Sequence, residues 1–330
     1  MFPIRFFIAL GLARCVWANS LAPLAARRSS FYARLPLAFF IIQLGLIRHA
    51  AAAACCGGGF AAPAMIVGDD EAQVTGSFTH TKMISDVDSQ GIWYAREQSE
   101  QSETFRLEAA HIVWDRFQFG ASIPVVQRSG KGHQSTGFGD ISETAGFEAL
   151  PEWDYSAWRP RGFVYLQLTN PSGRDVNESR AAFQLDARGR GFWSTAIGAI
   201  LTKTSRDFDF FINLDLHRSY DHHFENSQAS GELHPGWGGN FSLGAGYNLQ
   251  NWRLGSGLTW TYEDAVRATG DLPSSGAPQR FATASFAVTY LFKGELSTNL
   301  VYSDQTWFGD PNNTTLGRSV SLNLQKRWLR

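Results

Sequence analysis

The stretch LQNWRLGSGLTWTYED, residues 249–264, alternates between two kinds of side chain. Trp252, Leu254, Leu258 and Tyr262 share one parity, whereas the other parity holds arginine, glycine, threonine and glutamate. A β-strand points successive side chains to opposite faces, so this segment has an apolar face with aromatic ends and a polar face. Strands of soluble domains usually have about five or six residues. A strand that faces lipid needs about 9–11 residues and carries aromatic girdles at both interfaces, which this stretch matches.

The same alternation recurs along the chain from Glu71 onward. Charged residues occur on the polar parity, and because a dry core would exclude them, this face must meet water. The pattern predicts twelve strands, at 71–82, 102–114, 116–128, 137–150, 161–170, 190–203, 206–219, 238–249, 251–264, 279–292, 294–304 and 317–328.

Short and long connections between these strands alternate along the chain. Most of those after even-numbered strands are short, such as 114–116 and 203–205, with 151–160 as the long exception; those after odd-numbered strands are long and hydrophilic, such as 83–101 and 171–189. Short periplasmic turns and long extracellular loops are typical of outer-membrane barrels. We therefore predict an all-β fold, a transmembrane antiparallel β-barrel of about twelve strands. The alternative is a soluble protein of two packed sheets, which the strand length and the charged second face disfavour.

The N-terminal segment has the pattern of an export signal. Residues 35–47 form a short apolar run that is followed by small residues up to Ala54, and about thirteen apolar residues are too few to span a membrane comfortably. We expect cleavage after Ala54. This divides the chain into an export segment at 1–54, an N-terminal periplasmic tail at 55–70 and the barrel at 71–330. A start codon assigned upstream of the true one would explain the unusual length of the segment.

The cysteines and the charge limit the partners. An alternative interpretation is that Cys55 is the lipidated first residue of a lipoprotein. Ala52 disfavours this, because a large aliphatic residue is usual at that position. Cys55 and Cys56 are too few ligands for a closed zinc site, and we predict no cofactor. Residues 1–54 hold six arginines and no acid, so 23 basic and 30 acidic residues remain, a net charge of −7. Nucleic acid is thus an unfavourable partner.

No familiar catalytic motif occurs. Residues 129–132, Ser-Gly-Lys-Gly, lack the spacing of a phosphate-binding loop, and no Gly-x-Ser-x-Gly elbow is present. The densest titratable cluster is 217–223, in which His217 with His222 or His223 is a candidate metal site, or His217 a base for a serine. The alternation favours a different interpretation, with His217 in the lumen and the others in solvent. We therefore assign no catalytic and no metal-binding residue.

Inward-facing polar side chains form the candidate site. Mixed charges at close quarters predict ion pairs along the lumen wall, which either fill the bore or set its selectivity. The candidate lumen-lining residues are Arg106, Glu108, Gln118, Asp207, Asp209, Asp215, Arg253, Glu263, Asn299 and Arg327.

Two short motifs resemble a known family. Residues 137–141, Gly-Phe-Gly-Asp-Ile, open the fourth predicted strand, and residues 166–173, Leu-Gln-Leu-Thr-Asn-Pro-Ser-Gly, close the fifth. Together they resemble the outer-membrane barrels of the phenol-degradation meta-pathway family, in which a Gly-x-Gly-Asp strand start precedes a Pro-Thr-Gly turn. Ser172 replaces the usual threonine here, and Asn170 replaces an apolar residue. The resemblance implies a transporter-like barrel that passes small, often apolar solutes.

We therefore expect an exported protein of the Gram-negative cell outer membrane, without enzymatic activity, that serves as a passive or facilitated channel for a small solute. The expected partners are the lipid bilayer with its lipopolysaccharide, the barrel-assembly machinery and a small apolar solute. Two alternatives stay open. A barrel hydrolase requires a serine, a histidine and an acid close together, and a structural or surface barrel has a bore closed by side chains.

Overall fold

The computed structural model describes most of the chain beyond the export segment. Its described residues are 63–96, 100–154, 156, 158–225, 229–292 and 295–329. The predicted export segment and residues 55–62 of the tail therefore lie outside the described residues. Among the described residues no helix has the length and apolar character needed to cross a membrane.

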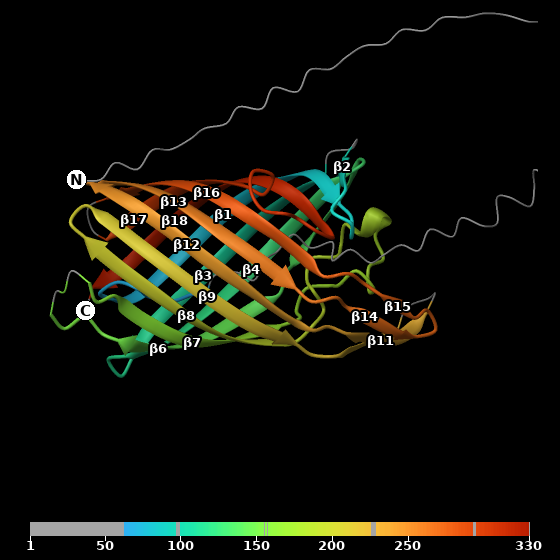
Figure 1. Cartoon of the computed structure of the whole chain (residues 1–330), viewed down its shortest axis with the longest axis horizontal. Coiled ribbons are helices and arrows are strands. Elements are labelled where there is room, and N and C mark those ends of the chain that lie inside the picture. Colours follow the sequence, from blue (N-terminus) through green and yellow to red (C-terminus); the bar gives the residue numbers. More distant parts are fainter. Residues whose placement is uncertain are drawn as a thin grey trace, which may run out of the picture. The chain divides into compact units, whose positions relative to one another are not determined.

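Twelve antiparallel strands form a closed ring (Figure 1). The register of β1 with β18 runs from Asp70 opposite Leu329 to Val87 opposite Thr314, and it closes the sheet so that neither strand is an edge. The predicted fold class, a twelve-stranded antiparallel barrel, is confirmed. The ring consists of β1 (Asp70–Val87), β3 (Gln101–Val113), β4 (Phe117–Gly130), β6 (Ile141–Leu150), β7 (Arg161–Asn170), β8 (Ser194–Ser205), β9 (Phe208–Ser219), β12 (Trp237–Leu249), β13 (Trp252–Glu263), β16 (Gln279–Leu291), β17 (Leu296–Asp304) and β18 (Thr314–Leu329).

The two ends of the barrel differ. At the end that we call the turn end, β3 and β4 are joined by residues 114–116 and β12 and β13 by 250–251, and β1 begins there beside the last residues of β18. The opposite end, the loop end, carries the long connections. Two of these contribute a small separate sheet that projects beyond the ring (Figure 1). Its strands are β10 (His222–Glu225), β11 (Ser230–His234), β14 (Arg267–Gly270) and β15 (Ser274–Ser275).

Strand β13 shows why the ring is apolar outside. Leu254 is 52% exposed and points outward, as do the aromatic residues near both ends of the strand. Trp252 near the turn end packs against Tyr290, with ring centroids 4.6 Å apart, and Trp260 near the loop end stacks on Phe241 at 5.7 Å. The alternate residues of β13 face the lumen. The strand thus presents aromatic pairs at two levels with leucines between them, as a lipid-facing strand requires.

The fourth predicted strand, 137–150, is shorter than expected. β6 begins only at Ile141, and β5 (His133–Phe138) pairs separately with the loop-end part of β4. The chain turns between them because the Asp140 carboxylate accepts hydrogen bonds from the backbone N–H groups of Gly173 and Arg190, at 3.1 and 2.7 Å. The same anchor holds Arg190 out of β8, so the sixth strand begins at Ser194 and not at residue 190.

The first and last strands are longer than predicted at the loop end. β1 continues to Val87, with a bulge between Met83 and Ser85, and it pairs there with residues at the start of β18. The short strand β2 (Trp93–Ala95) then folds back on β1. A bulge inserts an extra residue without ending the ladder of hydrogen bonds. The extra residue shifts the alternation of side chains, and for this reason the strand was predicted to end at residue 82.

Candidate functional site: the lumen

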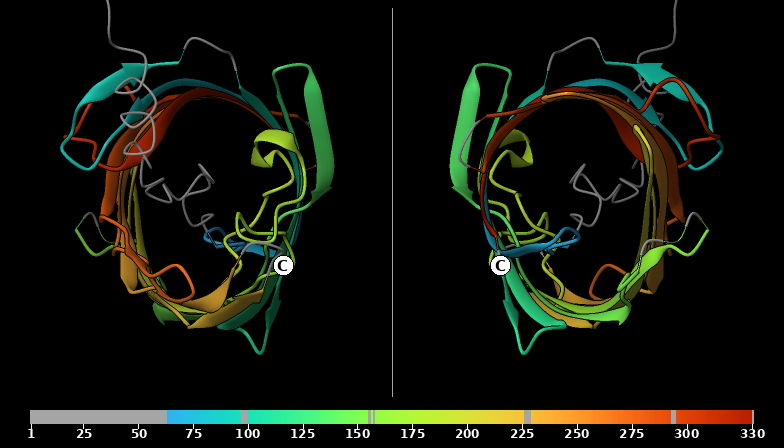
Figure 2. Two further views of the ribbon diagram at one scale, coloured as in Figure 1. Left: turned by 90° about the vertical axis from the view of Figure 1, so that its right-hand side faces the viewer. Right: turned by 90° about the vertical axis from the view of Figure 1, so that its left-hand side faces the viewer.

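Residues just before the first strand lie inside the lumen. Figure 2 shows this segment, in blue, within the ring of strands. The amide of Gln118 on β4 clamps it: Ile66 N–H donates to Gln118 Oε1 at 2.6 Å, and Gln118 Nε2 donates to Ile66 O at 3.0 Å. Met65 packs on Phe163 and Tyr165 of β7. We call residues 63–68 the plug.

The glycine at position 120 makes room for the plug. A Cβ atom there would lie 1.9 Å from the backbone oxygen of Ala64, a separation that two such atoms cannot adopt. Gln73 of β1 adds a third anchor, since its Nε2 donates to Met65 O at 2.9 Å. The plug therefore rests against the wall formed by β1, β4 and β7.

The long loop between β7 and β8, residues 171–193, also folds into the lumen (yellow-green in Figure 2). Arg128 of β4 donates from Nη1 to Ala187 O at 2.7 Å and forms an ion pair with Glu100. Leu185 and Ala187 are buried. At the other end of the loop, Arg190 Nη2 contacts Glu263 Oε1 of β13 at 2.7 Å.

Asp186 organises this loop internally. It accepts hydrogen bonds from the Ser179 hydroxyl, from Arg174 at 2.7 Å and from the backbone N–H groups of Arg180 and Ala181. Burial alone raises the pKa of Asp186, but these hydrogen bonds outweigh it and hold the pKa well below the usual range. The loop is therefore held by an ionised carboxylate at neutral pH.

A histidine between two acids lies behind this loop. His217 is fully buried; its Nδ1 lies 3.1 Å from Asp215 Oδ1 and its Nε2 lies 2.9 Å from Glu263 Oε2. Tyr165 donates its hydroxyl to the second oxygen of Asp215 at 3.3 Å. With Arg190, these residues make a continuous charged network across β7, β9 and β13. Both ring nitrogens of His217 contact carboxylates, so neither is directed at a serine hydroxyl.

The structure places the predicted lumen residues in several groups. Asp215 and Glu263 meet through His217. Arg253 and Asp209 form a separate pair at 2.5 Å nearer the turn end, and Arg106 lies 3.8 Å from Glu108. Three others were also predicted: Gln118 holds the plug, Asn299 lies on β17, and Arg327 lies 3.6 Å from Asp70. Asp207 lies exposed in the turn before β9, at the rim of the barrel and outside the strand.

Several residues that line the lumen were not predicted from the sequence. Arg128, Arg190 and the plug residues reach the lumen, but Arg190 belongs to a loop and the plug precedes the first strand. Strand alternation carries no information about connections that fold inward. Gln73, Arg128 and Tyr165 lie on strands, and their inward parity was a signal that could have identified them. The remaining histidines of the 217–223 cluster are outside the ring, on β10 of the projecting sheet. No group of three or more potential metal ligands occurs among the described residues.

The inward faces of β16, β17, β18 and β1 are of a different kind, and we call them the hydroxyl wall. Thr79 and Ser321 hydrogen-bond across the seam at 2.8 Å. Apart from Asp70 and Arg327 at the turn end, the described side chains of this wall are uncharged. Its polar, uncharged members include Gln73, Thr75, Ser77, Thr79, Thr81, Gln279, Thr283, Ser285, Thr289, Ser297, Asn299, Ser303, Ser319, Ser321, Asn323 and Gln325.

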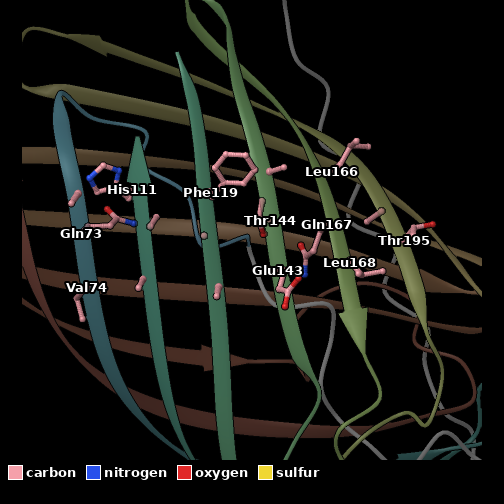
Figure 3. A pocket seen from close by; sticks show the side chains of 17 residues that line it. Gln73, Val74, His111, Phe119, Glu143, Thr144, Leu166, Gln167, Leu168 and Thr195 are labelled. Carbon is pink, nitrogen blue, oxygen red and sulfur yellow. The ribbon is translucent and has the colours of Figure 1, made fainter. Parts of the chain in front are cut away.

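A hollow of about 820 Å³ lies on the outside of the barrel, across β1 to β8. Figure 3 shows Glu143 on the same surface as Phe119, Leu166 and Leu168. Ala121, opposite Glu143 in the sheet, has too small a side chain to fill the space. Glu143 is exposed on this apolar surface, four residues along β6 from the aromatic Phe147. It is an outward carboxylate where the pattern predicts an apolar residue.

The fold is similar to that of a solved outer-membrane channel. The COG4313 outer membrane channel from Pseudomonas putida F1 aligns with a TM-score of 0.66 and 14% identity, over 80% of this chain and 97% of that chain. The translocator domain of the autotransporter NalP from Neisseria meningitidis aligns at 0.45 and 12%, over 79% and 90%. The CymD monoaromatic hydrocarbon channel aligns at 0.42 and 12%, over 80% and 90%.

No protein-family model matches the sequence, and no curated protein matches it. At these identities the structural likeness establishes the fold alone. The fold that the sequence resemblance implied is thereby confirmed: the chain is a twelve-stranded β-barrel of the outer-membrane type.

Proposed function

We propose that this protein is an outer-membrane channel that passes a small, uncharged solute by passive or facilitated diffusion. The observation that carries the proposal is the contrast within the lumen. The plug and the loop lie against the side formed by β4 to β9, with one further hydrogen bond to the plug from Gln73 of β1. The inward side chains of the hydroxyl wall opposite are mostly short, uncharged and able to form hydrogen bonds. Short side chains leave space beside them, and hydroxyl groups can replace water around a neutral solute at little electrostatic cost.

Buried polar atoms without hydrogen-bond partners support a solute that carries a hydrogen-bonding group. Within the described part of the chain, Thr144 Oγ1, Gln167 Oε1 and Asn299 Oδ1 are buried without a hydrogen-bond partner. Buried polar atoms normally have one, so each is a place where water or a passing solute can bind. An apolar solute with a single hydrogen-bonding group, of the kind that the sequence resemblance implied, satisfies both features.

The same proposal includes export, location and the absence of catalysis. Export by the N-terminal segment, insertion by the barrel-assembly machinery and contact with lipopolysaccharide follow from an outer-membrane location. The hydrolase alternative is disfavoured because His217, the one buried lumen histidine among the described residues, is held between Asp215 and Glu263. Fractionation tests the location: the protein should sediment with outer membranes, and recovery from the soluble periplasm contradicts it.

Single-channel conductance of the refolded protein in a planar bilayer tests the function. Wild type should give discrete conductance steps. Gln118→Leu removes both hydrogen bonds of the clamp while keeping a similar volume, so it should release the plug and raise the conductance. Ser321→Ala on the hydroxyl wall is the matched control and should leave the plug in place. A refolded, heat-modifiable wild type that gives no discrete steps would contradict a channel.

A further inference from the structure

A second outward hollow, of about 680 Å³, lies near the loop end across β9, β12 and β13. We call it the loop-end groove. Its sides are apolar and aromatic. Gly239 lies in its floor between Leu216 and Tyr262, where the absence of a side chain leaves space. The outward side chains that line it are Leu214, Leu216, Trp237, Phe241, Trp260 and Tyr262.

Two arginines lie at the loop-end side of this groove. Arg218 points outward and is exposed, with its guanidinium 5.4 Å from the ring centre of Trp237. Within the described residues it has no acidic partner in an ion pair. Arg280 lines the groove and contacts Asp310 Oδ2 at 2.5 Å, and both of these side chains are largely exposed. Asp264, the other acid nearby, accepts hydrogen bonds from the Tyr262 hydroxyl and from Trp237 N–H.

The order of these groups along the barrel axis matches one kind of ligand. Aliphatic and aromatic side chains accept a hydrocarbon chain, the aromatic residues mark the interface, and the arginines lie beyond it. Guanidinium groups bind phosphate through charge-assisted, bidentate hydrogen bonds. Stacking on Trp237 orders the Arg218 side chain in advance of binding. The combination suits an amphiphile with acyl chains and phosphates.

We propose that the loop-end groove binds lipopolysaccharide, with an acyl chain against Gly239 and its phosphates on Arg218 at one side of the groove and on Arg280 at the other. The proposal rests on the proposed outer-membrane location, because the loop end then faces the leaflet that contains this lipid. The hollow at Glu143 has the opposite charge character: it is apolar, its described lining residues include no arginine or lysine, and the carboxylate of Glu143 repels a phosphate.

Thermal unfolding in detergent micelles measures the binding, because a ligand of the folded state raises the unfolding midpoint. Purified full-length barrel is titrated with lipopolysaccharide and, separately, with phosphatidylglycerol. Wild type should be stabilised at lower concentrations of lipopolysaccharide than of phosphatidylglycerol. Arg218→Glu should need roughly tenfold more lipopolysaccharide for the same shift, since it loses a charge-assisted contact. Arg206→Glu, the same charge change in an exposed turn at the other end, is the control and should behave like wild type.

Arg218→Gln removes the positive charge without adding a negative one. It replaces Arg218→Glu in the titration if that variant does not fold. Equal stabilisation by the two lipids, or an unchanged titration in the Arg218 variants, would overturn the proposal. Channel conductance of the same variants separates this result from the proposed function. It should equal that of wild type, because Arg218 lies outside the lumen.

Discussion

The two sides of the lumen both present a polar inward face, but they do so with different kinds of side chain. On the side formed by β4 to β9, with Glu263 of β13 at the edge, several inward side chains are large or charged, among them Gln118, Arg128, Tyr165 and His217, and they hold the plug and the loop; we call this side the charged wall. The hydroxyl wall opposite uses mainly serine, threonine and asparagine, and its hydrogen bond to the plug comes from Gln73 of β1. Both walls belong to one closed sheet, in which inward and outward side chains alternate along every strand. A polar inward face is therefore a requirement of the barrel, whereas the kind of polar residue is free to serve function.

The largest expected effect tests the charged wall. Glu263→Ala removes the carboxylate shared by His217 and Arg190, and it leaves a fully buried histidine and a partly buried arginine without that partner. Loss of one member of a buried pair costs about 3–5 kcal/mol. Ser321→Ala on the hydroxyl wall loses one neutral hydrogen bond and should cost about 1 kcal/mol. Urea unfolding in lipid vesicles measures both, and similar losses would remove the distinction between the walls.

A second pair of variants tests the parity that defines both walls. Leu258→Arg puts a charge on the lipid-facing side of β13 and should cost about 2–4 kcal/mol. Thr259→Arg puts the same charge in the lumen, beside Ser242, and should be much better tolerated. The same urea titration applies. If the two variants are equally destabilised, the assignment of inward and outward faces on this strand is wrong.

The outside of the charged wall offers a smaller and opposite effect. Glu143→Leu removes a carboxylate from the apolar surface, so it should stabilise the barrel by about 1 kcal/mol, less than the cost of an arginine at such a position. Glu148→Leu, an inward residue of the same strand that contacts Arg161 at 2.6 Å, should instead destabilise it. A lower stability of Glu143→Leu would show that this carboxylate has a partner that it needs.

The smallest effect concerns the loop on the charged wall and depends on pH. Asp186 has a lowered pKa in the folded protein, so its contribution is complete above the ordinary aspartate range and is lost only as the pH falls through the lower, folded pKa. Conductance noise from loop motion should therefore stay constant near neutral pH and rise in strong acid. Asp186→Asn should show the noisy behaviour at every pH. A rise that begins near pH 6, where histidine titrates, would assign the effect to another group.

Much of this architecture could be predicted from residue alternation. The parity of Trp252 and Leu254 identified the lipid face, and the different lengths of the connections distinguished the two ends. Where prediction was inaccurate, the backbone left the simple ladder. The turn at Asp140, the bulge after Met83 and the separate strand β5 each depend on contacts with residues distant in sequence, and these contacts are not visible as a periodic pattern.

The sequence by itself determined that this chain forms a barrel, because a period of two over ten or more residues admits few other folds that bury the apolar face and hydrate the polar one. Only the tertiary structure decided what occupies the lumen. The plug, Arg190 and the partners of His217 come together through closure of the ring, which places segments far apart in the chain within hydrogen-bonding distance. Strand periodicity specifies the direction in which a side chain points, and the closed sheet specifies which side chains it meets there.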